Sequence, residues 1–387
     1  MKNPVSITSI ASVSPLGSKP EDIWRKYQTS EHAITAHDFE GNKAFGAFLP
    51  KELEEEVKKL RLSSQKWKNL DRSVLLAVLS ARAAVASSNW AKGADIGINI
   101  GSSRGATNLF ENHYDYFLKN GRAETLASPN TTLGNISSWV AQDLRSSGPE
   151  ISHSVTCSTG LHSVLNGVAW LQSGLCQKFL AGGSEAALTP FTISQMQAMK
   201  IYASEEKKYP CLALDMSKEK NSMILGEGAA MLCMENGSRE NAIAEISGIG
   251  YTTEELKHSV SISANGEGFQ KSMKMALEKV PPAEIDAVVM HAPGTIKGDA
   301  SEVNAINAIF GKEGPALTSN KWKIGHTFGA SGLLSLELAI MMLQHQEFIP
   351  VPFSELSNKR LPKRLKNILV NAVGFGGNSV SVLVCRK

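Results

Sequence analysis

The chain alternates short apolar runs of strand length with longer stretches whose apolar residues recur at helical spacing. Several of the short runs are apolar at successive positions, which is typical of strands that helices cover on both faces. Helices are predicted over 72–85, 301–310 and 333–344. Together these patterns predict an α/β fold. The predicted strands are 96–100, 151–155, 179–181, 231–234, 287–290, 368–373 and 380–384.

A weak internal duplication runs through this pattern. Two segments indicate a strand, a small-residue turn and then a helix, namely 151–171 and 315–343. Two further segments indicate a strand, a Gly-Gly turn and another strand, namely 177–188 and 367–384. This order predicts two similar halves that meet near 235–245: an N-terminal half over 1–240 and a C-terminal half over 241–387.

The composition is that of a soluble globular protein, since 42% of the 387 residues are hydrophobic and 20% are charged. The net charge of +3 is too small to indicate a nucleic-acid partner, and no apolar stretch is long enough to span a membrane. No secretory signal is visible. Five cysteines without a CxxC pair argue against a disulfide framework or a zinc site. We therefore expect a cytoplasmic protein that uses no metal and no cofactor.

Cys157 is the cysteine whose surroundings best fit a nucleophile. It lies between the predicted strand 151–155 and a predicted helix with Leu161, Val164 and Val168 on one face. A helix N-terminus presents free N–H groups and a partial positive charge, which favour a thiolate and stabilise an oxyanion. We therefore expect a lowered pKa for this thiol. On local sequence alone, an inert buried cysteine is the competing interpretation.

Two histidines follow predicted strands in glycine-containing surroundings. His291 comes directly after the run 287–290, and His326 lies between glycines just ahead of an apolar helix. Decarboxylation of a malonyl thioester develops negative charge on the thioester oxygen. Two neutral imidazoles that each donate an N–H can stabilise that charge without a metal. Taken singly, each histidine is more often structural, but the two together with Cys157 favour a catalytic site.

A Gly-Phe-Gly-Gly turn follows the predicted strand 368–373. Its glycines, Gly374 and Gly376 among them, permit left-handed backbone angles and a close approach of the chain. Phe375 is expected to be a mobile, bulky side chain between them. A plain hairpin explains the same residues equally well.

Taken in order, these segments resemble a known family. TCSTG with Cys157, HAPGTIKGD with His291, SNKWKIGH with Lys321 and His326, and GFGG with Phe375 are similar to motifs of the elongating β-ketoacyl-acyl-carrier-protein synthases. These are condensing enzymes of the thiolase superfamily. The similarity runs from about residue 5 to residue 384, so it covers nearly the whole chain.

The resemblance implies a five-layered αβαβα thiolase-like fold, built from two similar halves and usually dimeric. It implies that Cys157 takes an acyl group from an acyl carrier protein, and that His291 and His326 support decarboxylation and condensation. Lys321 would order the site near an acid, and Glu302 stands at the matching position.

The resemblance also assigns roles to the glycine-rich turn. The backbone N–H groups of Cys157 and Phe375 would form the oxyanion hole, with Gly374 and Gly376 in support. Phe375 would also gate entry to the site. Thiolases and initiating synthases carry a different third residue in the triad, so histidine at both positions favours the elongating, malonyl-using branch.

Three features depart from the family pattern. Ala292 and Pro293 replace the usual Gly-Thr after the first histidine, and Asn378 replaces the Thr after the glycine-rich turn. An arginine-rich segment is degraded to CLALDMSKEKNSMIL over 211–225. These changes affect the expected substrate more than the reaction. They would fit a specialised polyene or polyketide synthase, either a homodimer or a heterodimer with a related chain, in place of a fatty-acid enzyme.

Two other functions stay open. A non-catalytic chain-length partner of a heterodimeric ketosynthase would have the fold without the chemistry, although such partners typically lack the nucleophilic cysteine. A thiolase that acts without decarboxylation is disfavoured by the two histidines.

The carrier proteins of this family are acidic, so a basic patch is expected near the mouth of the site. Two groups of residues are candidates for it, although a run of charges is usually just a solvated face. The candidates are Lys207 and Lys208, and the cluster Lys58, Lys59 and Arg61.

Overall fold

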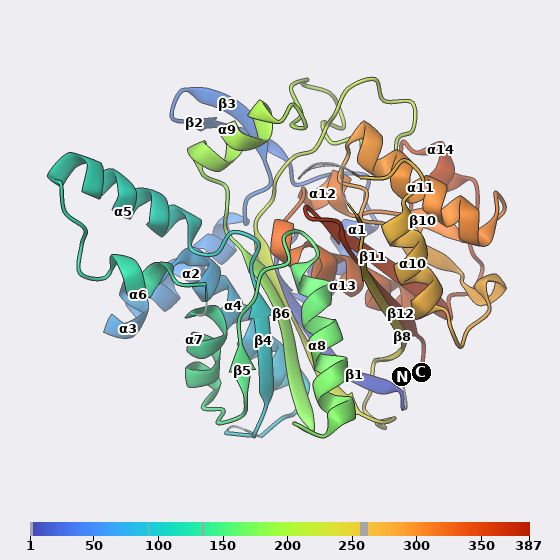
Figure 1. Ribbon diagram of the computed structural model, residues 1–387, viewed down its shortest axis with the longest axis horizontal. Coiled ribbons are helices and arrows are strands. Elements are labelled where there is room, and N and C mark those ends of the chain that lie inside the picture. The colour runs from blue at the N-terminus through green and yellow to red at the C-terminus, as the bar shows by residue number, and fades with distance from the viewer. Residues whose placement is uncertain (1–2, 92, 134, 256–261) are drawn as a thin grey trace.

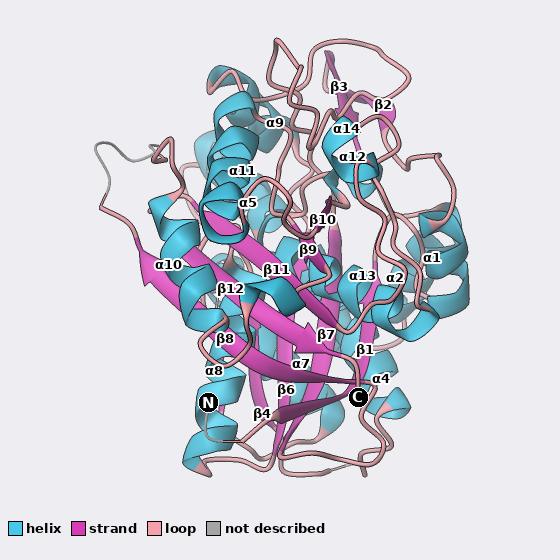
Figure 2. Cartoon of the chain, turned by 90° about the vertical axis from the view of Figure 1, so that its right-hand side faces the viewer, coloured by secondary structure: helices cyan, strands magenta, loops and turns pink. Residues whose placement is uncertain are grey.

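The computed structural model describes residues 3–91, 93–133, 135–255 and 262–387. Two five-stranded sheets lie with helices between them and outside them (Figures 1 and 2). The first sheet, in spatial order, contains β1 (Val5–Val13), β7 (Gly228–Asn236), β6 (Lys178–Glu185), β4 (Gly97–Gly101) and β5 (Glu150–Ile151). The second contains β10 (Ala316–Thr318), β9 (Ala287–Val289), β11 (Asn367–Gly374), β12 (Asn378–Cys385) and β8 (Ala244–Thr253).

The two sheets have the same connectivity. In the first, β4 pairs in parallel with β5 and β6, and β7 pairs antiparallel with β6 and β1. In the second, β9 pairs in parallel with β10 and β11, and β12 pairs antiparallel with β11 and β8. The weak duplication in the sequence thus has a counterpart in the topology. The division between 240 and 241 itself stays a prediction.

Two helices form the layer between the sheets. α8 (Thr159–Ser173) packs against β6 and β4, and α13 (Ser331–His345) packs against β11 and β7. Every residue of α13 from Ser331 to Leu343 is buried, which explains why its sequence is apolar on all sides. The largest apolar cluster joins both helices to both sheets, so the core of the molecule is this middle layer.

Further helices cover the outer faces. α4 (Arg72–Ser87) and α7 (Asn135–Leu144) cover the first sheet, and α10 (Glu267–Ala276) with α11 (Ile296–Phe310) covers the second. The result is the predicted αβαβα arrangement. The remaining elements are α1 (Pro20–Tyr27), β2 (Thr35–Phe39), β3 (Asn42–Gly46), α2 (Lys51–Leu62), α3 (Gln65–Lys68), α5 (Thr107–Asn120), α6 (Ala127–Thr131), α9 (Pro190–Ala198), α12 (Lys321–Ile324), α14 (Glu355–Asn358) and the short 3₁₀ helices η1 (Pro282–Glu284) and η2 (Phe328–Ala330).

The predicted strand 151–155 is wrong beyond its first residue. β5 ends at Ile151, and the chain then turns, because side chains take the backbone groups that a strand would use for pairing. The hydroxyl of Thr159 accepts a hydrogen bond from the N–H of Val155 (2.8 Å), and the carbonyl of Val155 accepts one from the hydroxyl of Ser158 (2.8 Å). The other predicted strands coincide with β4, β6, β7, β9, β11 and β12 to within one residue or lie inside them.

The predicted helices are confirmed, and one begins earlier than expected. α11 starts at Ile296, five residues before the predicted start at 301. Thr295 caps it, since its hydroxyl accepts a hydrogen bond from the N–H of Gly298 (3.2 Å). In the part of the chain that the structure describes, no helix combines the length and apolarity needed to cross a membrane.

Candidate active site

Cys157 lies in the tight turn that leads into α8. The preceding residue, Thr156, has a φ of 48°, which is uncommon for a residue with a β-carbon. The Cys157 side chain is 7% exposed and belongs to a small apolar cluster, separate from the main core, together with Ile193, Met196 and Phe328. The turn therefore places the sulfur at the tip of a central helix and at the edge of an apolar compartment.

The expected lowering of the Cys157 pKa is wrong. Burial raises the pKa of this thiol to about 12, and the negative charge of Glu185 raises it further, while Lys321 and Arg104 act in the opposite direction. The sequence places the cysteine at a helix tip correctly, but it does not reveal the burial or the carboxylate nearby. At neutral pH the resting side chain is a thiol, so it must lose its proton as it attacks.

His291 and His326 lie against each other. Their ring centroids are 5.1 Å apart, and the rings meet edge to face at 89°. The His326 ring also lies 5.5 Å from that of Phe328, which shares the apolar cluster with Cys157. These contacts link the two imidazoles, drawn from separate segments of the C-terminal half, to the compartment of the sulfur.

Both imidazoles are neutral at physiological pH. Burial lowers the pKa of His326 to about 3 and holds the pKa of His291 well below its ordinary value, and the charge of Lys321 adds to both shifts. Among the described residues, the Nδ1 atom of each ring is buried without a hydrogen-bond partner. Neutral rings with an unused nitrogen have the character needed to donate to an oxyanion.

Lys321 is held by neutral side chains. Its ammonium donates to the Asn320 side-chain oxygen (3.0 Å) and to the Ser335 hydroxyl (3.0 Å). Burial lowers its pKa to about 8, while the charge of Glu302 favours the protonated form. The electric field of Lys321 acts on Cys157, His291 and His326, so this lysine is central to the site.

Glu302 lies near enough to Lys321 for its charge to favour the protonated lysine, and within the described ranges the two side chains form no ion pair. Its carboxylate accepts hydrogen bonds from the backbone N–H groups of His291 (3.0 Å) and Ala292 (2.9 Å), and from the Asn371 amide (3.1 Å). Glu302 therefore fixes the backbone that carries His291 and reaches Lys321 only through space.

The degraded segment 211–225 is ordered and holds the loop after His291. Lys218 and Asp299 form a buried ion pair (2.8 Å), and Asp299 also accepts from the N–H of Gly294 (3.0 Å). Ser222 donates its N–H to the carbonyl of Gly294 (2.9 Å). The segment thus positions the histidine loop even though it lacks the arginines expected from the family.

The glycine-rich turn touches the turn that carries Cys157. The Thr156 hydroxyl donates to the carbonyl of Phe375 (3.1 Å). A β-carbon at Gly374 would lie 1.9 Å from the Thr156 hydroxyl and 3.2 Å from the backbone nitrogen of Cys157, so this approach requires glycine. Gly376 has a φ of +95°. The backbone of Cys157 and that of Phe375 therefore lie on adjoining turns.

Glu185 belongs to the site and was not singled out from the sequence. It is fully buried at the end of β6 and accepts from the Ser102 hydroxyl (2.9 Å) and from the N–H groups of Ser103 (2.7 Å), Arg104 (3.2 Å) and Gly329 (3.0 Å). It thereby joins the loop after β4 to the η2 turn. The hydrogen-bond partners of Glu185 lie far away in sequence, so a local pattern does not reveal its role.

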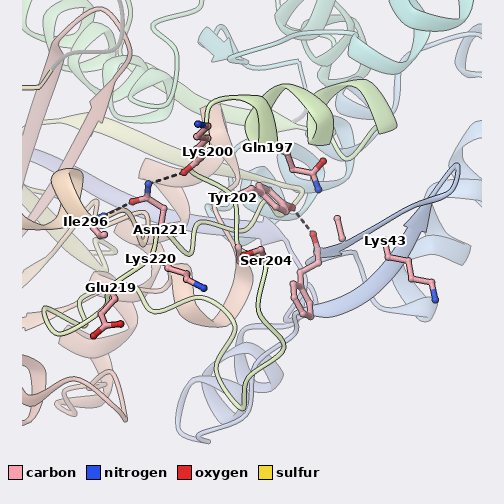
Figure 3. A pocket seen from close by; sticks show the side chains of 12 residues that line it. Lys43, Gln197, Lys200, Tyr202, Ser204, Glu219, Lys220, Asn221 and Ile296 are labelled. Carbon is pink, nitrogen blue, oxygen red and sulfur yellow. Dashed lines mark hydrogen bonds between the residues drawn. The ribbon is translucent and has the colours of Figure 1, made fainter.

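An open pocket of about 540 Å³ lies outside the histidine loop. Asn221 bridges two of its walls, since its side-chain amide donates to the carbonyl of Lys200 (2.9 Å) and its side-chain oxygen accepts from the N–H of Ile296 (2.9 Å) (Figure 3). Lys43, Lys200 and Lys220 contribute to the lining. Glu219 also lines the pocket and Lys220 pairs with Glu205 (2.5 Å), so the rim next to the segment that follows His291 has mixed charge, with Lys43 and Lys200 on its basic part.

The residues considered for a basic docking patch have mixed surroundings. Lys207 forms an ion pair with Glu205 (2.6 Å). Arg61 donates to the carbonyl groups of Lys68 (3.1 Å) and Leu70 (2.8 Å), so it connects the last turn of α2 to the segment that follows α3. Within the described ranges, no cluster of three or more His, Cys, Asp or Glu side chains is arranged to hold a metal ion.

Comparison with known proteins matches this architecture. The family model for the N-terminal domain of β-ketoacyl synthases matches residues 2–240, and the model for the C-terminal domain matches residues 243–353. The chain is 26% identical to 3-oxoacyl-[acyl-carrier-protein] synthase 2 of Coxiella burnetii, covering all of this chain and 99% of that protein. It is 25% identical to the enzyme of the same name from Staphylococcus aureus, over 99% of this chain and 98% of the other.

Solved structures share the fold at lower identity. A chain of the ishigamide ketosynthase/chain length factor superposes with a TM-score of 0.87 at 20% identity, over 100% of this chain and 100% of that chain. A β-ketoacyl synthase from Burkholderia phymatum superposes with a TM-score of 0.82 at 21% identity, also over both complete chains. Because the two family models together match most of the sequence, the chain belongs to the β-ketoacyl synthase family.

Proposed function

We propose that this chain is an active ketosynthase that condenses a Cys157-bound acyl group with a malonyl-carrier protein. The observation that carries this proposal is the contact of two neutral imidazoles, 5.1 Å apart, beside the compartment that holds the only cysteine at a helix tip in the described part of the chain. Such a set suits thioester chemistry, which needs a nucleophile and separate stabilisation of an enolate oxygen.

In the first half-reaction the acyl group moves from a carrier protein to Cys157. The sulfur attacks the thioester carbonyl, the carrier leaves as a thiolate, and this thiolate takes up the proton that Cys157 has lost. The oxyanion of the tetrahedral intermediate accepts hydrogen bonds from the backbone N–H groups of Cys157 and Phe375, which lie on adjoining turns. Phe375 is 41% exposed, as a gate at the entrance needs to be.

In the second half-reaction the malonyl thioester loses CO₂. The electrons of the broken carbon–carbon bond form an enolate, whose oxygen accepts hydrogen bonds from His291 and His326. The enolate carbon then attacks the acyl carbonyl on Cys157, and the thiolate leaves and takes up a proton. The product is a carrier-bound β-ketoacyl group that is two carbons longer than the acyl group.

A carrier protein is the proposed source of both substrates. Lys43 and Lys200 line the open pocket outside the histidine loop and form no ion pair within the described ranges, which supports the approach of an acidic carrier from that side. Lys207 and Lys208, two of the candidates from the sequence, lie in the segment between α9 and β7. Lys207 lines a second pocket together with Lys220. We propose that both lysines extend the docking surface.

A second ketosynthase-like chain is the proposed structural partner. α5 extends away from the body of the molecule (Figure 1), and its exposed apolar side chains include Phe110, Tyr114, Phe117 and Leu118. An exposed apolar surface of this kind is typical of a protein interface. A chain from the complex of a ketosynthase with its chain length factor from Xenorhabdus doucetiae superposes with a TM-score of 0.81, at 19% identity over 100% of this chain and 98% of that one. Two such chains suit a specialised polyene or polyketide pathway as well as fatty-acid synthesis.

The alternative function is that of a non-catalytic chain-length partner. The raised pKa of Cys157 favours it, because a thiol that stays protonated is a poor nucleophile. The test is the intact mass of the protein after incubation with an acyl-carrier protein thioester. An acyl adduct that maps to Cys157 and disappears in Cys157→Ala supports the enzyme. If the wild-type chain forms no adduct, alone or with its partner chain, the partner role is correct.

A further inference from the structure

Arg104 reaches the candidate site from the loop after β4. Its side chain donates a hydrogen bond to the side-chain oxygen of Gln195 on α9. Its guanidinium carbon lies 5.9 Å from the centroid of the Phe328 ring, a distance at which a cation is attracted to the face of a ring. The backbone N–H of Arg104 donates to Glu185 (3.2 Å), so the loop itself is anchored.

The charge of Arg104 acts through space on the Glu111 carboxyl, and no carboxylate among the described residues is in ion-pair contact with it. The Nε atom of Arg104 is buried and meets no hydrogen-bond acceptor among those same residues. Buried donors are nearly always paired in folded proteins. The unpaired Nε–H of Arg104 therefore indicates that a bound ligand supplies an acceptor for it.

The position of Arg104 indicates which ligand this is. Phe328, against which the guanidinium lies, shares its apolar cluster with Cys157, Ile193 and Met196. The positive charge of Arg104 also acts on the Cys157 thiol, whose pKa it lowers slightly against the larger effects of burial and Glu185. An acyl group on Cys157 that extends into this cluster therefore passes close to the cation.

We propose that Arg104 selects acyl groups that carry an oxygen acceptor, either a keto oxygen or a carboxylate, over plain saturated chains. This inference rests on the proposed role of Cys157 as the acyl acceptor. A saturated chain leaves the buried N–H unpaired, whereas an oxygen on the chain accepts from it. Sites built around a buried polar group discriminate strongly against analogues that lack its partner.

The test compares three N-acetylcysteamine thioesters of equal chain length: octanoyl, 3-oxooctanoyl and 7-carboxyheptanoyl. The rate of adduct formation on Cys157 of the full chain is followed by intact-protein mass. The wild type is expected to react faster with at least one oxygen-bearing thioester than with octanoyl, and the faster one identifies the oxygen as keto or carboxylate. In Arg104→Met this preference is expected to fall about tenfold, which corresponds to ~1.4 kcal/mol.

Two control variants separate the role of the guanidinium from general effects on folding. Arg104→Lys keeps the charge but not the Nε–H, so it is expected to retain only part of the preference. Arg122→Met removes an exposed arginine elsewhere and is expected to leave the preference unchanged. An equal or faster reaction with octanoyl in the wild type, or an unchanged rate ratio in Arg104→Met, overturns this inference and leaves the proposed function standing. If no adduct forms with any of the thioesters, the proposed function fails and the inference fails with it.

Discussion

The thiol of Cys157 is held protonated at rest by the residues around it. Burial has the largest effect on its pKa, and the buried carboxylate of Glu185 adds to it. The same carboxylate accepts hydrogen bonds from two loops, so it serves both as a structural joint and as a local negative charge. A thiol of this kind reacts more slowly with alkylating reagents, because the thiolate is the reactive form.

Replacing Glu185 with Gln is expected to make Cys157 more reactive. The substitution removes a negative charge near the sulfur, so the thiolate is favoured and its alkylation by iodoacetamide at pH 8 becomes roughly threefold faster or more, since each pKa unit is a factor of ten. Glu337→Gln is the matched control, because Glu337 is also a buried carboxyl with a pKa raised to about 7 but does not act on Cys157. Equal alkylation rates in both variants and the wild type would mean that Glu185 does not influence the thiol.

The turns that position the site are short, and their geometry depends on single residues. Gly374 is the clearest case, because a β-carbon there meets both the Thr156 hydroxyl and the backbone of Cys157. The two turns can approach each other only if one of them lacks a side chain at that point. This contact lies between the two halves of the chain, so it also sets how the glycine-rich turn faces the nucleophile.

Gly374→Ala is expected to slow acylation of Cys157 at least about tenfold, because the glycine-rich turn must move away from the nucleophile and the oxyanion hole then loses its geometry. The measurement is the rate of adduct formation from an acyl thioester, together with a thermal melt that confirms folding. Gly311→Ala is the control: its β-carbon meets no atom within 4 Å, but its φ of +73° makes alanine strained there, so the variant shows the effect of a destabilising glycine substitution away from the site and is expected to keep the wild-type rate. Wild-type acylation by a folded Gly374→Ala protein would rule out the proposed role of the turn.

Elements with a clear apolar pattern could be predicted from the sequence, and elements formed by polar side chains could not. The strands of the central sheets are apolar runs, so their positions follow from the pattern. The turn after Ile151 is held by the hydroxyls of Ser158 and Thr159, and local side-chain bonds of this type leave little trace in a hydrophobic pattern. The early start of α11 depends on the Thr295 cap for the same reason.

The same limit applies to the candidate site. His291 closely follows β9, Cys157 directly precedes α8 and its cap, and His326 stands between α12 and the η2 turn next to Gly325, so local sequence and the family motifs indicate these three residues. Glu185 and Arg104 act through partners that are distant in sequence, such as Gly329, and no local motif marks them. Distances, burial and electric fields arise only when the two halves fold together.

At the scale of the whole molecule, buried ionisable groups make stability depend on pH. Burial raises the pKa values of Glu185, Glu302 and Glu337 to about 7, and it lowers those of Lys321 and Lys323 to about 8. A raised carboxyl pKa means that the folded state holds a proton that the unfolded state releases above its ordinary value of 4.5. Stability from these groups is therefore present at low pH and is lost as pH rises through about 7.

The contribution of one carboxyl is isolated by comparing the wild type with Glu337→Gln, because the histidines also change protonation in this range: their ordinary pKa is 6.5, and burial lowers the pKa values of His291 and His326 in the folded state. The thermal midpoint of the wild type, taken relative to that of Glu337→Gln, is expected to fall between about pH 5.5 and about pH 7.5. The measurement is Tm of both proteins by scanning calorimetry across this range at constant ionic strength. A wild-type Tm that does not fall relative to the variant would contradict a buried, protonated carboxyl at Glu337.

The central claim is that the sulfur and the imidazoles are separate parts of one site, the first for acyl transfer and the second for decarboxylation. The most direct measurement is CO₂ release from a malonyl-carrier protein by two variants that cannot be acylated. Cys157→Ala is expected to release CO₂, because His291 and His326 still stabilise the enolate, whereas Cys157→Ala combined with His326→Ala is expected to release at least about tenfold less. Equal release by the two variants would contradict the account.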